Sequence, residues 1–298
     1  QQKQRKLSEW VNFLTSAEIP VLKQTARNLA ILEQDEQHLN ARSIAHVVKY
    51  DPLMTVKLLR YLQQHKHRCQ EHDVVEVEQI IMLLGLETTL HKVSAKPLVE
   101  EILGRDNMSA LVYLLKVTHR ANLASSYAFD WAIRLHDLHF EEIRIAALLH
   151  DITEILMWCF SPNEMLKIRN LQKLDKSLRS TAAQESILGF SLHQLQLELA
   201  IKWKLPELLI TLMDDNCSKL KRVRNVALAV NLARHSANGW DDASLPDDYE
   251  EIAKLLHLQV WEIVTLVGAN KQPESQINNE IVDIQPHMEF CISYKTKS

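Results

Sequence analysis

The sequence has 298 residues, of which 46% are hydrophobic and 24% charged, and its formal net charge is −4. This composition is that of a globular protein with a sizeable core, and the charge provides no bulk electrostatic attraction for nucleic acid or anionic membranes. Its 5 Gly and 8 Pro are few for the many tight turns of an all-β fold, whereas helix-forming residues are abundant. We therefore expect an all-α fold.

The first part of the chain predicts a series of helices. Apolar residues at helical spacing predict a helix over residues 19–32. Asn40 is a suitable N-cap for the helix that follows it, and Asp51 is one for the next, with Pro52 at the first helical position. Two short helices are expected around Gly85.

The strongest helical patterns lie in the middle of the chain. Residues 109–129 predict a long helix that ends in a polar loop. Residues 143–160 (IRIAALLHDITEILMWCF) predict the next helix as one continuous element. Its apolar residues cover nearly all sides, which is typical of a central buried helix. Within this run, His150 and Asp151 form the one adjacent His-Asp pair.

The last part of the chain predicts further helices. Residues 191–205 form a helical pattern that Pro206 stops, and we expect Trp203 and Leu205 in the core. Three more helical patterns follow. Residues 271–298 change in character, with some β propensity, and are interpreted as a tail.

Several of these segments, taken in order, resemble the HDOD family, the HD-related output domains of bacterial signalling proteins. The similarity covers roughly residues 10–235. Its most specific elements are DPLMTVKLLRYLQ at 51–63, LLHD at 148–151 and W-x-LP at 203–206. The resemblance implies an all-helical fold in which an N-terminal helical subdomain packs on a bundle derived from HD phosphohydrolases.

The resemblance also suggests how the chain is divided. We expect a polar lead-in at residues 1–9, the N-terminal helical part at 10–105, the HD-like bundle at 106–270 and the tail at 271–298.

A metal site is a further implication, since HD enzymes use an upstream His, the adjacent His-Asp pair and a downstream Asp. His119 lies 31 residues before His150, a spacing similar to the family's, and His150 and Asp151 are intact. The fourth position falls on Asn231, a neutral residue and a poor ligand for such a metal. A shift of one helical turn would change this neighbour.

The residues after the His-Asp pair also depart from the pattern of HD-GYP enzymes, which have a Gly-Lys there whose Lys contacts phosphate. This chain has Thr153 and Glu154, and a carboxylate repels phosphate. We therefore predict a non-catalytic signal-transduction module that acts by binding and conformational coupling, with no cofactor. His119, His150 and Asp151 would form a buried hydrogen-bonded cluster.

Two alternatives remain open. In the first, the degenerate site still binds Mn, Fe, Ni or Zn and the protein is a metal-dependent phosphohydrolase or phosphodiesterase. In the second, the protein is an adaptor or binds a nucleotide without metal. By family analogy, the expected partner is a signalling protein or an upstream receiver or sensor domain. Because the chain begins with Gln1 rather than Met, we expect a further segment upstream.

Other clusters of chemically active residues have simpler interpretations. One His- and Cys-containing group lacks the usual spacing of zinc ligands and is interpreted as a solvated loop. Its members are His65, His67, Cys69 and His72. A second His-Asp sequence, residues 136–139, lies in the polar loop before the buried segment. We interpret it as solvated.

A basic run is a weak candidate for binding phosphate, and its simpler interpretation is the solvated start of a helix. It contains Lys219, Lys221, Arg222 and Arg224. His193 is expected in a capping or core role, with packing near the His-Asp pair as the alternative. Asp214 and Asp215 occupy positions where many relatives have a His pair, so metal-type ligands are lost there, although carboxylates are possible substitutes.

The expected compartment is the cytoplasm. The sequence has no signal peptide and no run of 18 apolar residues, which argues against membrane insertion. The four cysteines are far apart and are interpreted as reduced thiols. They are Cys69, Cys159, Cys217 and Cys291.

Overall fold

The structure is a computed structural model that describes residues 5–65, 73–175, 177–217 and 219–269. Within these ranges the chain forms sixteen α-helices and no strand, apart from two isolated β-bridges, which confirms the predicted all-α class. None of the helices in these ranges is both long and apolar enough to cross a membrane. The predicted tail lies outside the described residues.

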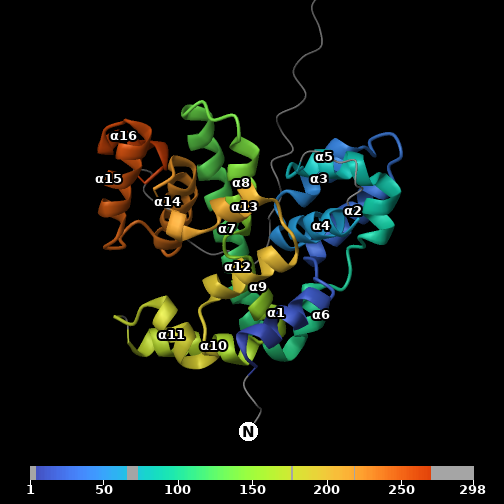
Figure 1. The fold of residues 1–298 in the computed structure, drawn as a ribbon, viewed down its shortest axis with the longest axis horizontal. Helices are drawn as coiled ribbons and strands as arrows, with labels where there is room; N and C mark the ends of the chain where they lie inside the picture. Colours follow the sequence, from blue (N-terminus) through green and yellow to red (C-terminus); the bar gives the residue numbers. More distant parts are fainter. Residues whose placement is uncertain (1–4, 66–72, 176, 218, 270–298) are drawn as a thin grey trace, which may run out of the picture.

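The first six helices form the N-terminal part of the fold (Figure 1). They are α1 (Leu7–Ser16), α2 (Lys23–Glu33), α3 (Ala41–Val48), α4 (Pro52–Gln64), α5 (Val77–Leu84) and α6 (Val99–Leu103). The remaining helices are α7 (Met108–Arg134), α8 (Phe140–Leu149), α9 (Ile152–Phe160), α10 (Pro162–Leu174), α11 (Ser180–Leu188), α12 (Leu192–Lys202), α13 (Glu207–Leu212), α14 (Lys221–His235), α15 (Leu245–Leu256) and α16 (Val260–Leu266).

Two of the N-terminal helices begin at the N-cap residues that the sequence predicts. The Asn40 side chain accepts a hydrogen bond from the backbone N–H of Ser43 at the start of α3. Asp51 accepts hydrogen bonds from the first turn of α4, and Pro52 occupies its first position. α5 ends at Gly85, whose φ of 83° is in the region that favours glycine.

The helix predicted over residues 19–32 is shorter in the structure. α2 begins at Lys23 because the backbone of Val21 is extended and bound to another segment. The Val21 N–H donates to Pro97 O at 2.9 Å, and the Val21 carbonyl accepts from Val99 N at 3.0 Å. These bonds hold the entry to α2 against the start of α6.

Two buried cations of α4 anchor the segment that follows α1. Lys57 is 4% exposed, donates to two backbone carbonyls at 2.6 and 3.2 Å, and pairs with Glu18. Arg60 donates to carbonyls at the C-terminal end of α1, including that of Ala17 at 3.0 Å. The negative end of the α1 dipole favours this cation. The KLLR part of the family pattern therefore has a structural role here.

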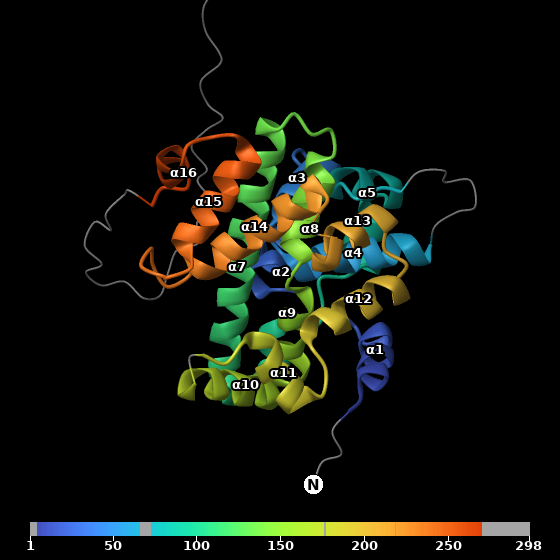
Figure 2. The same cartoon turned by 60° about the vertical axis from the view of Figure 1, so that its left-hand side comes forward.

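The long helix α7 is the central element of the second part, where α8, α9 and α14 pack against it (Figure 1). α15 and α16 follow beyond α14, and α10 and α11 pack on each other at the opposite end of the molecule (Figure 2). α1, at the start of the chain, packs against α12. The N-terminal part therefore meets the second part at more than one place.

The buried segment 143–160 is two helices rather than the one that its apolar pattern predicts. α8 ends at Leu149 and α9 begins at Ile152. Between them Asp151 leaves the helical region, with φ −104° and ψ 21°. The predicted burial is confirmed, because most side chains of α8 and α9 are buried.

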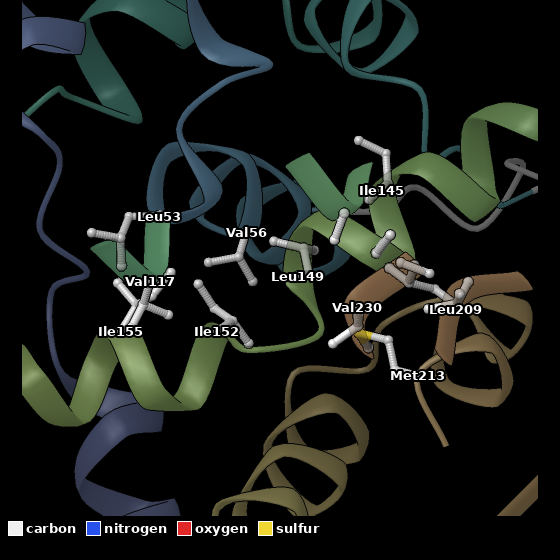
Figure 3. Packing of buried hydrophobic residues seen from close by; sticks show 14 of the residues in the cluster. Leu53, Val56, Val117, Ile145, Leu149, Ile152, Ile155, Leu209, Met213 and Val230 are labelled. Carbon is white, nitrogen blue, oxygen red and sulfur yellow. The ribbon is translucent and has the colours of Figure 1, made fainter. Parts of the chain in front are cut away.

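A single hydrophobic cluster joins the two parts of the fold. Figure 3 shows Leu53 and Val56 of α4 beside Ile152 and Ile155 of α9, with the cluster continuing toward Leu209 in α13. Trp203 and Leu205 are buried in the same cluster, as predicted. α8 and α9 thus hold the His-Asp pair at a fixed place beside the core.

Candidate functional site

A pocket of about 260 Å³ contains His150 and Asp151. It lies where α7, α9, α10, α11, α12 and α14 meet, and the short turn before α14 contributes Asp215. Its lining is rich in charge and includes three arginines and three carboxylates. These residues are Arg120, Arg169, Arg234, Asp151, Glu154 and Asp215.

Asp151 is held by cations on both of its carboxylate oxygens. Arg120 from α7 donates to Oδ2 at 2.6 and 3.2 Å, and Arg234 from α14 donates to Oδ1 at 3.3 Å. Burial alone would raise the pKa of this carboxyl, but the two guanidinium groups and His150 hold it well below its usual range. Asp151 is therefore a fully ionised carboxylate inside a charged network.

His150 lies between two carboxylates. Its Nδ1 is 3.4 Å from Asp151 Oδ1 and its Nε2 is 3.2 Å from Asp215 Oδ1. Burial opposes protonation, but the hydrogen bonds to these two carboxylates outweigh that effect and raise the pKa of His150 to about 9. At neutral pH the ring is thus an imidazolium that donates from both nitrogens.

The two residues that replace the Gly-Lys pattern have clear contacts. The Thr153 hydroxyl donates to the carbonyl of Leu192 at 3.0 Å and so joins α9 to the start of α12. Glu154 accepts a hydrogen bond from Arg120 at 2.8 Å. The carboxylate at this position therefore belongs to the same charged network as Asp151.

The structure does not bring together all four residues predicted as metal ligands. His150 and Asp151 lie together, but His119 is exposed and lines a different, largely apolar pocket of about 370 Å³ with Tyr50. The predicted cluster of all three residues therefore does not form. Asn231 is half-buried on α14 and is not among the residues that line the His150 pocket.

Two arginines that the sequence reasoning missed take the corresponding positions. Arg120 directly follows His119, and the 31-residue spacing recurs between Arg120 and Asp151. Arg234 lies about one helical turn after Asn231, the kind of shift that the sequence left open. The sequence signal for these arginines was their position: Arg120 is next to the candidate His119, and Arg234 is about one turn from the candidate Asn231.

The residues of this pocket do not fit the divalent metal that the family resemblance implies. Asp151 already accepts from two arginines, and both nitrogens of His150 face carboxylates. A metal ligand must present a free lone pair, which an imidazolium lacks. Among the described residues, no group of three or more His, Cys, Asp or Glu is arranged to hold a metal ion.

His193 and Asp214 lie near the same pocket. His193 lines it, and its Nε2 is 3.6 Å from Asp214 Oδ1, which is beyond hydrogen-bond distance. Asp214 also accepts from the backbone of Asn216. Asp215 thus contacts His150, and Asp214 lies near His193.

The basic run at the start of α14 is engaged in ion pairs. Arg222 binds Asp137 at 2.7 Å, and Arg224 pairs with Glu251 of α15. Lys221 is exposed. The two arginines named as phosphate candidates are therefore occupied by carboxylates, and Asp137 of the second His-Asp sequence has a structural ion pair.

Of the predicted solvated loop with three histidines and a cysteine, only His65 falls within the described residues. It is exposed at the end of α4 and bonds to the carbonyl of Tyr61. Cys159 and Cys217 are free thiols.

The fold and the site together define a class: a helical protein that carries an HD-like His-Asp pair within an arginine-rich network. The HDOD domain family matches residues 19–216. The match covers well over half of the sequence, and this chain belongs to the HDOD family.

Solved structures share the fold at low sequence identity. The response regulator MmoQ from Methylococcus capsulatus is 18% identical, with a TM-score of 0.60, over 85% of this chain and 99% of that one. A virulence factor from Campylobacter jejuni is also 18% identical, with a TM-score of 0.59, over 89% and 92%. No curated protein matches this chain significantly in sequence.

Proposed function

We propose that this chain is a non-catalytic signalling module that acts by binding and conformational coupling. The observation that carries the proposal is the pair of arginines on Asp151, with Arg120 at 2.6 Å and Arg234 at 3.3 Å. Membership of the HDOD family and the fold shared with a protein described as a response regulator support a role in signalling.

The charges of the pocket argue against phosphoester hydrolysis of the HD type. Such hydrolysis uses a metal that polarises the phosphoryl oxygen and activates water at an open coordination position. Here a metal would have to displace a guanidinium from Asp151 and a proton from His150, whose pKa is about 9. Both displacements oppose metal binding at neutral pH.

The same network suits a coupling role. Arg120, Arg234 and His150 connect α7, α14 and the α8–α9 junction through one buried carboxylate. Any partner or ligand that shifts one of these elements acts on the others through Asp151. A signalling protein, or a receiver or sensor domain, is the partner class that we propose.

The decisive experiment measures metal and turnover together. The chain, without a histidine tag, is offered Mn, Fe, Ni and Zn, its metal content is measured by mass spectrometry, and cyclic dinucleotides and nucleotide phosphates are tested as substrates. We expect no stoichiometric metal and no turnover. Near-stoichiometric metal that disappears in His150→Ala, together with hydrolysis, would establish the phosphohydrolase alternative instead.

A further inference from the structure

A second pocket, of about 370 Å³, lies between the N-terminal helices and α7. Side chains of α2 and α3 provide one part of its wall, and side chains of α7, including His119, provide another. We call it the His119 pocket. Its volume falls in the usual range of sites for small molecules, about 300–1,000 Å³. His150 and its carboxylate partners belong to the other pocket.

The His119 pocket differs from the His150 pocket in the charge of its wall. None of the described residues that line it is an Asp, Glu, Lys or Arg. Partial burial, together with the nearby Lys49, lowers the pKa of His46 below its ordinary value, so this lining ring is neutral at pH 7. A charged molecule that entered would lose hydration without gaining an ion pair. The wall therefore favours a neutral occupant.

Apolar and aromatic side chains of this pocket remain partly open to solvent. Leu22 and Val47 are half-buried, and Leu115 is 41% exposed. The exposed ring of Tyr50 lies edge-on to that of His46, with the centroids 6.0 Å apart. Exposed apolar side chains that gather around one hollow are typical of a ligand site, because an apolar ligand removes them from water.

The polar lining residues hold the pocket in place without a ligand. Asn122 Nδ2 donates to the carbonyl of Tyr50 at 2.8 Å and to that of Thr118 at 3.0 Å. Both amide hydrogens are thus used, which fixes the orientation of the side chain and ties the turn before α4 to α7. On α2, Gln24 donates to Asn28 at 2.9 Å. The pocket is therefore already formed in the empty chain.

We propose that the His119 pocket binds a neutral aromatic molecule of two or three rings. A cavity of about 150 Å³ accommodates benzene, so one of about 370 Å³ accommodates a larger ring system. The rings of Tyr50 and His46 offer the edges and faces against which an aromatic ligand packs. The proposal goes beyond the proposed function, because it adds a ligand outside the His150 network. This ligand contacts α2, α3 and α7 at once and strengthens the attachment of the N-terminal helices to α7.

The test compares two fluorescent probes that share one ring system, each titrated into the full chain. N-phenyl-1-naphthylamine is neutral, and 8-anilino-1-naphthalenesulfonate carries an added sulfonate. We expect the neutral probe to bind saturably, one molecule per chain, with enhanced emission. The sulfonate should bind at least about tenfold more weakly, because the pocket wall provides no cation for it.

A pair of variants on α7 locates the binding. Leu115→Glu places a charge in the wall of the pocket and should weaken binding of the neutral probe at least about tenfold. Val112→Glu is the matched control, since Val112 is similarly exposed on the same helix but does not line the pocket. Circular dichroism should show the wild-type helical spectrum for both variants.

Hydrogen exchange of the wild type provides a readout that needs no variant. The neutral probe should slow amide exchange in α3 and in residues 115–122, and should leave α15 unchanged. Absence of saturable binding, equally tight binding of the sulfonate, or equal effects of the two substitutions would overturn the proposal. Slowed exchange confined to other helices would also overturn it. The proposed function fails on a different result, namely hydrolysis with bound metal.

Discussion

Arg120 illustrates how much of the site's free energy depends on one residue. Its side chain is 16% exposed and pairs with two carboxylates, of which Asp151 is 12% exposed. Arg120→Met leaves a buried carboxylate without its nearest cation and should lower the free energy of unfolding by about 3–5 kcal/mol. Urea denaturation followed by circular dichroism measures this change.

The matched control is Arg134→Met on the same helix. Arg134 pairs with Asp130 on the exposed face, and exposed pairs contribute less than about 1 kcal/mol. If the two variants lose similar stability, the Asp151 network does not have the importance assigned to it.

His150 should make stability depend on pH. Its pKa rises from 6.5 in the unfolded chain to about 9 in the folded one. The stabilising effect is therefore complete below pH 6.5 and is lost as the pH rises through about 9, a loss of up to about 3 kcal/mol. Denaturation curves at intervals from pH 6 to 10 should show this decline in the wild type but not in His150→Gln. Parallel profiles would contradict the assignment.

At the scale of single residues, the sequence predicted which helix lies beside the His-Asp pair but not which side chain makes the contact. The spacing of His119 to His150 indicated correctly that α7 lies beside the His-Asp pair, but Arg120 is the residue that makes the contact. Neighbours on a helix point about 100° apart, so an error of one residue in the register exchanges them. Only the packing of α7 fixes that register.

Among the elements, α1 depends on a cation from another helix. Arg60 donates to carbonyls at the end of α1 and is 8% exposed. Arg60→Met should release this end, so amide hydrogen exchange in residues 7–16 should accelerate at least tenfold while exchange in α7 changes little. Arg42→Met, at an exposed pair with Glu78, is the control. Uniform acceleration along the chain would instead indicate global destabilisation.

The sequence predicted most elements correctly and failed at the α8–α9 junction. Capping residues such as Asn40 and Asp51 act locally, so their effects can be read from neighbouring residues. At the break, the Asp151 side chain contacts arginines that are 31 and 83 positions away. Apolar spacing continues across the break, and no local signal of Gly or Pro marks it.

For the whole molecule, the shared core predicts a single cooperative unfolding transition. Leu53 and Val56 of α4 pack near Ile152 of α9 (Figure 3), so neither part can lose its core alone. Leu149→Ala should cost about 2–5 kcal/mol and shift the circular dichroism and tryptophan fluorescence transitions together. Separate transitions for the two signals would show that the parts unfold independently.

The all-α class and the family were predictable because composition and ordered motifs extend over most of the chain. The pocket was not, because its lining comes from six helices, and only their packing brings these residues together. Arg234 is an example: it has no distinguishing pattern in the sequence, and its place in the pocket follows only from the packing of α14.

The consecutive residues His119 and Arg120 open onto two separate cavities, one of about 370 Å³ and one of about 260 Å³. Helix α7 is thus a wall that both pockets share. A change in the tilt or rotation of α7 at one pocket therefore also changes the shape of the other pocket. The two pockets are therefore coupled through the position of α7, without any direct contact between them.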